Sequence, residues 1–151
     1  MKSTALKLNA FLIAPLILAQ AATTFAGDLK VHVTGIQKHQ GVLLVNVFSS
    51  ADGFPDHPEH AARSLTIPVP SSGDSTQDFK VEGLEIGATA VSLFHDENSN
   101  GKLDTGLFGI PKERLGFSQN PRLGTHAPGF DECQFELPNS GTTIEIQLKH
   151  Y

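Results

Sequence analysis

The chain has 151 residues, one cysteine and a formal net charge of −5 with its histidines counted as neutral. A single cysteine excludes an internal disulfide, and the length suits one domain that buries a core without such crosslinks. The acidic balance argues against nucleic acid and anionic lipid as partners, because both require a basic face.

The first 26 residues have the layout of a secretory signal peptide. Lys2 and Lys7 precede the apolar stretch Ala10–Ala22, and small residues ending in Ala26 follow it. The stretch is shorter than the about 20 apolar residues that a membrane-spanning helix needs. We predict cleavage after Ala26, a single mature domain over residues 27–151, and a location in the periplasm or outside the cell. Loss of the two lysines leaves the mature domain at −7, with no integral membrane segment.

Seven segments of the mature chain alternate apolar and polar residues or are apolar on both faces, which is typical of β-strands. They are residues 30–34, 41–49, 64–69, 77–81, 88–95, 133–137 and 142–149. Turn-forming residues separate them, and a single short helical turn is expected within 57–63. The pattern predicts an all-β fold, a seven-strand antiparallel β-sandwich of the immunoglobulin or prealbumin type, with a β-barrel as the alternative. In this pattern Cys133 is a packed strand residue in phase with Phe135 and Leu137.

Two connections are unusually long, residues 50–63 and 96–130. Loops of this length in a compact domain are usually functional or disordered. The second one contains four large apolar residues that can bury and therefore argue against disorder: Phe108, Ile110, Leu115 and Phe117.

The segment that follows His95 has the spacing of a calcium-binding loop. Oxygen-bearing side chains alternate, a glycine comes at the sixth position, and an acid comes at the ninth; the predicted ligands are Asp96, Asn98, Asn100, the carbonyl of Lys102, and Asp104. Calcium takes six to eight oxygen ligands, and Gly101 permits the sharp bend that wraps them around one ion.

Two features depart from the EF-hand pattern. Leu107 stands where a bidentate glutamate is expected, and a strand rather than a helix leads into the loop. A complete site therefore needs further oxygens, for which Glu113, Asp131 and Glu132 are candidates. The alternative is a metal-free turn, in which the same side chains accept hydrogen bonds from backbone amides.

The stretch Phe94–Ser118 resembles the signature of a bacterial family of exported proteins, domain of unknown function 2141. The matching motifs are His-Asp-x-Asn-x-Asn-Gly from His95, Leu-Asp at 103–104, Gly-Ile-Pro-Lys-Glu at 109–113 and Gly-Phe-Ser at 116–118. The resemblance extends over essentially the whole mature chain. It implies an exported sandwich domain, similar in outline to prealbumin-like and carboxypeptidase-regulatory-like modules, and it assigns no activity.

Histidines supply the alternative function. His57 and His60 could share one helical turn and bind zinc or copper if His95 or His126 supplied a third ligand. No nucleophile elbow and no phosphate-binding loop is present, and no catalytic residue is assigned. The sequence therefore favours an exported, non-enzymatic binding or structural module with a possible calcium loop and an unknown ligand or protein partner. A metal-dependent enzyme that uses His57, His60, His95 and nearby acids is the alternative.

Overall fold

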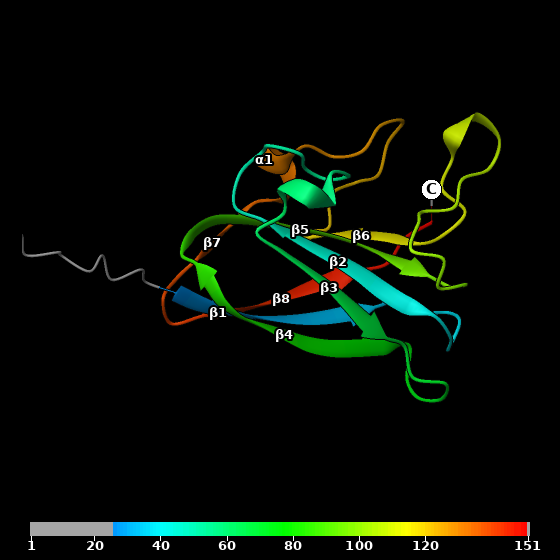
Figure 1. The fold of residues 1–151 in the computed structure, drawn as a ribbon, viewed down its shortest axis with the longest axis horizontal. Coiled ribbons are helices and arrows are strands. Elements are labelled where there is room, and N and C mark those ends of the chain that lie inside the picture. The colour runs from blue at the N-terminus through cyan, green and yellow to red at the C-terminus, as the bar shows by residue number, and fades with distance from the viewer. Residues whose placement is uncertain (1–25, 151) are drawn as a thin grey trace, which may run out of the picture.

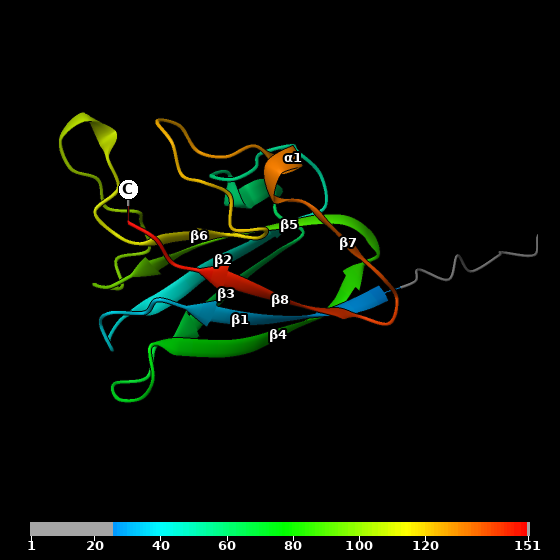
Figure 2. The same ribbon diagram turned by 180° about the vertical axis from the view of Figure 1, so that it is seen from behind.

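The computed structural model describes residues 26–150 and consists of two packed β-sheets (Figure 1, Figure 2). The predicted signal peptide lies outside the described residues except for Ala26, which begins the first strand. The three-stranded sheet has the order β4 (Thr76–Glu85), β1 (Ala26–Thr34), β8 (Thr142–Gln147). Among the described residues, no helix is long and apolar enough to cross a bilayer.

The five-stranded sheet carries the functional features described below. Its main path is β3 (Arg63–Pro68), β2 (Val42–Phe48), β5 (Gly87–Asp96), β6 (Leu115–Phe117), and β7 (Phe135–Leu137) pairs with the start of β5. One helical turn, α1 (Phe130–Cys133), and two short 3-10 turns, η1 (Pro58–His60) and η2 (Leu107–Gly109), lie in the connections.

These features confirm the all-β sandwich, and the described strands form two separate sheets rather than a closed barrel. Two details differ from the sequence-based prediction. An eighth strand, β6, lies inside the second long connection, and β1 pairs with β8 in parallel. The alternation of side chains reveals a strand but not its direction. Strand β7 belongs to the five-stranded sheet and β8 to the three-stranded sheet, where β8 runs in the same direction as β1.

Cys133 ends α1 instead of extending strand β7. Its side chain is nonetheless fully buried, as predicted. Burial raises the pKa of the Cys133 thiol to about 12. The in-phase pattern with Phe135 and Leu137 identified a packed residue correctly but assigned it to the wrong element.

The main core lies between the sheets. β1 contributes Leu29, Val31 and Val33 to it, while β2 and β5 contribute buried valines and leucines from the facing sheet. A second, smaller cluster covers the outer face of the five-stranded sheet. Its members are Ala90, Leu115, Phe117 and Cys133, with Phe54, Phe94, Leu103, Leu123 and Phe130 packed against them. The two long connections therefore pack against the outer face of the five-stranded sheet.

Candidate functional site

The loop after β5 is organised by a buried carboxylate. Asp96 is the last residue of β5 and is fully buried. Its Oδ1 accepts the backbone N–H of Asn100 at 3.1 Å, and its Oδ2 accepts that of Gly101 at 2.7 Å. Gly101 has a φ of +77°, the left-handed conformation that the sharp bend was predicted to require.

The remaining predicted side chains continue this pattern around the loop. Asn98 Oδ1 accepts the N–H of Asn100 at 3.0 Å, and Asn100 Oδ1 accepts that of Lys102 at 2.8 Å. The carboxylate of Asp104 accepts the side-chain amides of Asn98 at 2.7 Å and Asn100 at 3.1 Å. The structure thus brings Asn98, Asn100 and Asp104 into one hydrogen-bonded set, on the same loop as Asp96.

Glu113 closes the base of this loop. Its carboxylate accepts the backbone N–H of Glu97 through Oε1 and of Asp104 through Oε2, both at 3.0 Å, and it is only 4% exposed. Glu113, one of the candidates for a further metal ligand, holds the two ends of the loop together through their amides.

The other two candidate acids do not reach the loop. Asp131 and Glu132 are exposed on α1, whose Cys133 packs with Ala90 near the opposite end of β5. Within residues 26–150, no group of three or more histidine, cysteine, aspartate or glutamate side chains is placed to hold a metal ion.

The histidines do not form a common site either. The ring centroids of His57 and His60 lie 6.0 Å apart. Nδ1 of His57 lies 3.0 Å from Oε1 of Glu59, and Nδ1 of His60 lies 2.9 Å from Oδ2 of Asp52. The carboxylate of Glu59, which accepts the hydrogen bond of the His57 ring, raises the pKa of His57.

His95 belongs to a different part of the molecule from this histidine pair. It is fully buried, and its Nε2 hydrogen-bonds the carbonyl of Gln40 at 2.8 Å. Its Nδ1 has no partner, unlike every other buried side-chain nitrogen or oxygen of the described chain. The structure therefore does not bring His95 together with His57 and His60.

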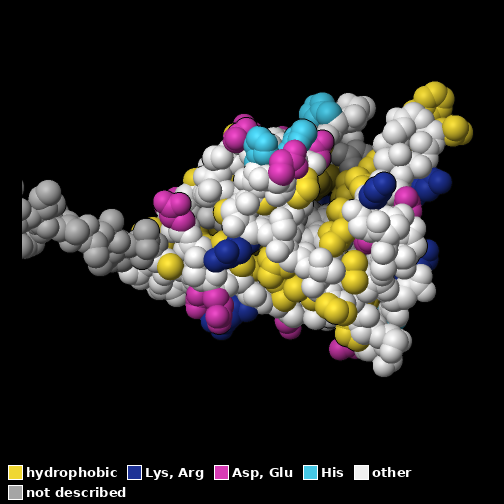
Figure 3. All heavy atoms as spheres, viewed as in Figure 1, with side chains coloured by type: hydrophobic (Ala, Val, Ile, Leu, Met, Phe, Trp, Pro, Cys, Tyr) yellow, Lys and Arg dark blue, Asp and Glu magenta, His cyan; other side chains and the backbone are white. Residues whose placement is uncertain are grey.

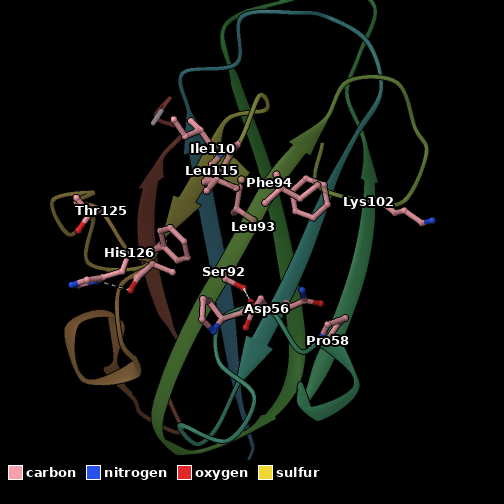
Figure 4. Close-up of a pocket in the computed structure, with 18 of the residues that line it drawn as sticks. Asp56, Pro58, Ser92, Leu93, Phe94, Lys102, Ile110, Leu115, Thr125 and His126 are labelled. Atoms are coloured by element: carbon pink, nitrogen blue, oxygen red, sulfur yellow. Dashed lines mark hydrogen bonds between the residues drawn. The ribbon is translucent and has the colours of Figure 1, made fainter. Parts of the chain in front are cut away.

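A cleft of about 760 Å³ opens on the outer face of the five-stranded sheet (Figure 4). β2, β5 and β6 form its floor, and three connecting segments border it: 55–58, 101–111 and 124–127. Apolar side chains dominate the lining, including Phe94, Leu103, Leu115 and Phe117. The Asp96–Asp104 loop therefore forms part of one wall of the cleft, through Gly101, Lys102 and Leu103.

Few polar groups accompany this apolar lining. Ser92 lies on the floor and donates from Oγ to the carbonyl of Pro55 at 2.8 Å, which ties the bordering segment to β5. Asn46, from the neighbouring strand β2, pairs with Ser92 in the sheet. Asp56, Lys102 and His126 supply ionisable side chains to the lining. The combination of apolar walls and a few hydrogen-bonding groups is typical of a small-molecule site.

Sequence reasoning missed this cleft because its lining comes from segments that are distant in the chain. The signal that was present lies in the second long connection, where Leu115 and Phe117 bury as predicted. The same prediction is wrong for Phe108 and Ile110, which are 97% and 51% exposed. Apolar character marked the connection as ordered but could not say which of its side chains face water.

The comparisons with known proteins bear on the whole domain. No curated protein and no solved structure matches the chain. A family model described as an uncharacterized protein conserved in bacteria, DUF2141, matches residues 31–145, from β1 to β8, and includes the loop, Glu113 and the cleft. The chain therefore belongs to the bacterial family DUF2141.

Proposed function

We propose that this protein is an exported binding module, without catalytic activity, that takes a small apolar or amphipathic molecule in the cleft on its five-stranded sheet. The cleft is the observation that carries this proposal. Its volume of about 760 Å³ falls within the 300–1,000 Å³ typical of small-molecule sites, and its floor is a rigid sheet rather than a flexible loop.

The chemistry of the lining indicates the class of ligand. Apolar side chains line the floor, so the body of the ligand is apolar. Asn46 and Ser92 supply hydrogen-bonding groups on the floor. A ligand with an apolar body and one polar group would match this arrangement.

Binding of a neutral fluorescent probe, N-phenyl-1-naphthylamine, tests the proposal. Asn46 lines the cleft from β2 and is partly buried, as is Leu44 on the same face of the strand. We expect wild-type protein to enhance the probe's fluorescence saturably and Asn46→Lys to weaken binding about tenfold, because a charge would enter the apolar lining.

The matched control is Thr66→Lys, which adds the same charge to the adjacent strand β3 at an exposed position outside the cleft. This variant should bind the probe like the wild type. Absence of saturable binding, or an equal loss in both variants, would contradict the proposal.

We further propose that calcium binds the Asp96–Asp104 loop and stabilises the cleft wall. The alternating oxygens of Asp96, Asn98 and Asn100, together with the bend at Gly101, support this. The amides that Asp104 accepts from Asn98 and Asn100 would have to give way to the ion, so the affinity should be modest. The melting temperature of the protein as a function of calcium concentration tests this part separately.

A further inference from the structure

Three of the four large apolar side chains that are exposed within residues 26–150 are located at one point of the molecule. Leu107 is 83% exposed, Phe108 97% and Ile110 51%, whereas the fourth, Ile86, is 38% exposed and lies elsewhere. Figure 3 shows the apolar tip projecting from the body of the protein at the upper right. These side chains contribute little to the packing of the domain.

The tip is held on a regular hairpin. A bridge pairs Thr105 with Pro111, the N–H of Gly106 donates to the carbonyl of Ile110 at 2.7 Å, and that of Lys112 donates to the carbonyl of Asp104 at 2.8 Å. Glu113 fixes the base by accepting the N–H of Asp104. The backbone therefore presents the apolar residues in a defined geometry.

The turn places Phe108 in a strained backbone conformation. Phe108 has φ 61° and ψ 20°, and Gly109 has φ 73°. Positive φ at both central positions is the signature of a type I′ turn, in which asparagine followed by glycine is preferred. A bulky side chain is strained in this conformation. Phe108 is thus held in an unfavourable conformation with its ring in water, which points to a role outside the folded domain.

From this geometry we propose that the tip Leu107–Ile110 is a membrane-contact element that inserts its apolar side chains into the interface of a phospholipid bilayer. A tip of four residues is too small for a stable protein interface, which buries about 800 Å² on each partner. A projecting apolar tip can enter the headgroup region of a bilayer without matching a surface of equal size.

Charges near the tip fit the same partner. Figure 3 shows lysine or arginine side chains close to it. Lys112 follows the hairpin and its side chain lies over Gly106, since a Cβ built there would be 3.5 Å from Lys112 Cε. Lys102 is exposed on the adjoining loop. Such lysines reach phosphate groups while their stems remain near apolar atoms. The acidic remainder of the chain would keep the contact confined to the tip.

The absence of tryptophan from the chain permits a direct test. Phe108→Trp places a single tryptophan at the tip, and Ile86→Trp places one at the other exposed apolar position as the matched control. With vesicles of phosphatidylcholine, we expect the emission of the first variant to shift to the blue and that of the second to stay unchanged. The wild-type protein should float with the vesicles.

A third variant separates insertion from folding. Phe108→Asn suits the type I′ turn and removes the apolar ring, so its melting temperature should not fall, while its vesicle partitioning should drop about tenfold. Unchanged emission of Phe108→Trp with vesicles would overturn the proposal. A blue shift that depends on protein concentration and not on lipid would also overturn it, because it would identify a second copy of the chain as the occupant.

Discussion

At the scale of single residues, Glu113 joins the two ends of the Asp96–Asp104 loop. Its carboxylate accepts two backbone amides, of Glu97 and Asp104, and is nearly excluded from water. Leaving a buried donor unsatisfied costs about 1–3 kcal/mol. Because the amide of a glutamine would turn its NH₂ group toward one of these donors, we expect Glu113→Gln to lower the unfolding free energy by this amount in urea denaturation.

Glu132→Gln is the matched control for this change. Glu132 is exposed and accepts a single N–H, that of Gly129, through Oε2. The glutamine oxygen can accept the same bond, so the unfolding free energy should change by less than about 0.5 kcal/mol. Equal effects of the two substitutions would show that the loop base does not depend on Glu113.

A second residue-scale prediction concerns Cys133. Its side chain is fully buried, and burial raises the pKa of its thiol to about 12. Because the thiolate is the reactive form, the native protein should react with a disulfide reagent such as 5,5′-dithiobis(2-nitrobenzoate) far more slowly than the urea-unfolded protein at pH 8. Labelling at equal rates in the two states would contradict the buried position.

At the scale of elements, the Asp96–Asp104 loop gives a prediction for calcium. Asp96 would be an ambiguous target, because both of its oxygens accept backbone amides and its loss would destabilise the loop with or without the ion. Asp104 is the better position for a substitution, because its carboxylate accepts hydrogen bonds from the side-chain amides of Asn98 and Asn100. Calcium at about 100 times Kd should stabilise the wild type by about 2.7 kcal/mol, seen as a rise of several degrees in melting temperature.

Asp104→Asn should lose this response, because it removes one of the two charged ligands. Asp131→Asn, an equivalent change on the exposed face of α1, should retain it. Magnesium should raise the melting temperature less than calcium, because it demands a tighter octahedral geometry. A wild-type melting temperature that is unaffected by millimolar calcium would leave the loop as a metal-free turn.

The elements also show how far the sequence could be read. Side-chain alternation located the strands of both sheets, because burial on one face leaves a period of two. It could not give the parallel pairing of β1 with β8, nor β6, which has three residues and no room for a pattern. Within the loop, the spacing from Asp96 to Asp104 predicted which side chains converge.

The role of Glu113 and the cleft escaped prediction for one reason. Each depends on contacts between segments that only the tertiary fold brings together. Glu113 meets the loop because β6 returns along β5, and Asn46 meets Ser92 because β2 and β5 pair. Local sequence patterns do not indicate these contacts between distant segments.

At the scale of the whole molecule, the cleft and the apolar hairpin lie on the same side. Phe108, Gly109 and Ile110 belong to the tip and also to the lining of the cleft. A domain that contacts a bilayer through this tip would hold the mouth of its binding site beside the lipid. The two proposals are separable, because Asn46→Lys should weaken probe binding without changing vesicle flotation. Leu107→Asn, at a tip residue outside the cleft lining, should lower vesicle flotation without changing probe binding.

Export is the other prediction at this scale. The charged, apolar and small-residue order of residues 1–26 predicts removal of that segment. Intact-mass measurement of the protein from the periplasm or the medium should therefore give a chain that begins at Gly27. A mature protein that retains Met1 would contradict both the cleavage and the proposed location.

The central claim is that the cleft binds an apolar molecule, and its location is tested most directly by nuclear magnetic resonance. Amide shifts of ¹⁵N-labelled protein should be followed during titration with N-phenyl-1-naphthylamine. We predict that the largest changes occur in the residues that line the cleft, Ser92, Leu93, Lys102, Leu103, Thr125 and His126. Changes confined to β1, β4 and β8 of the opposite sheet, or none at saturating probe, would contradict the claim.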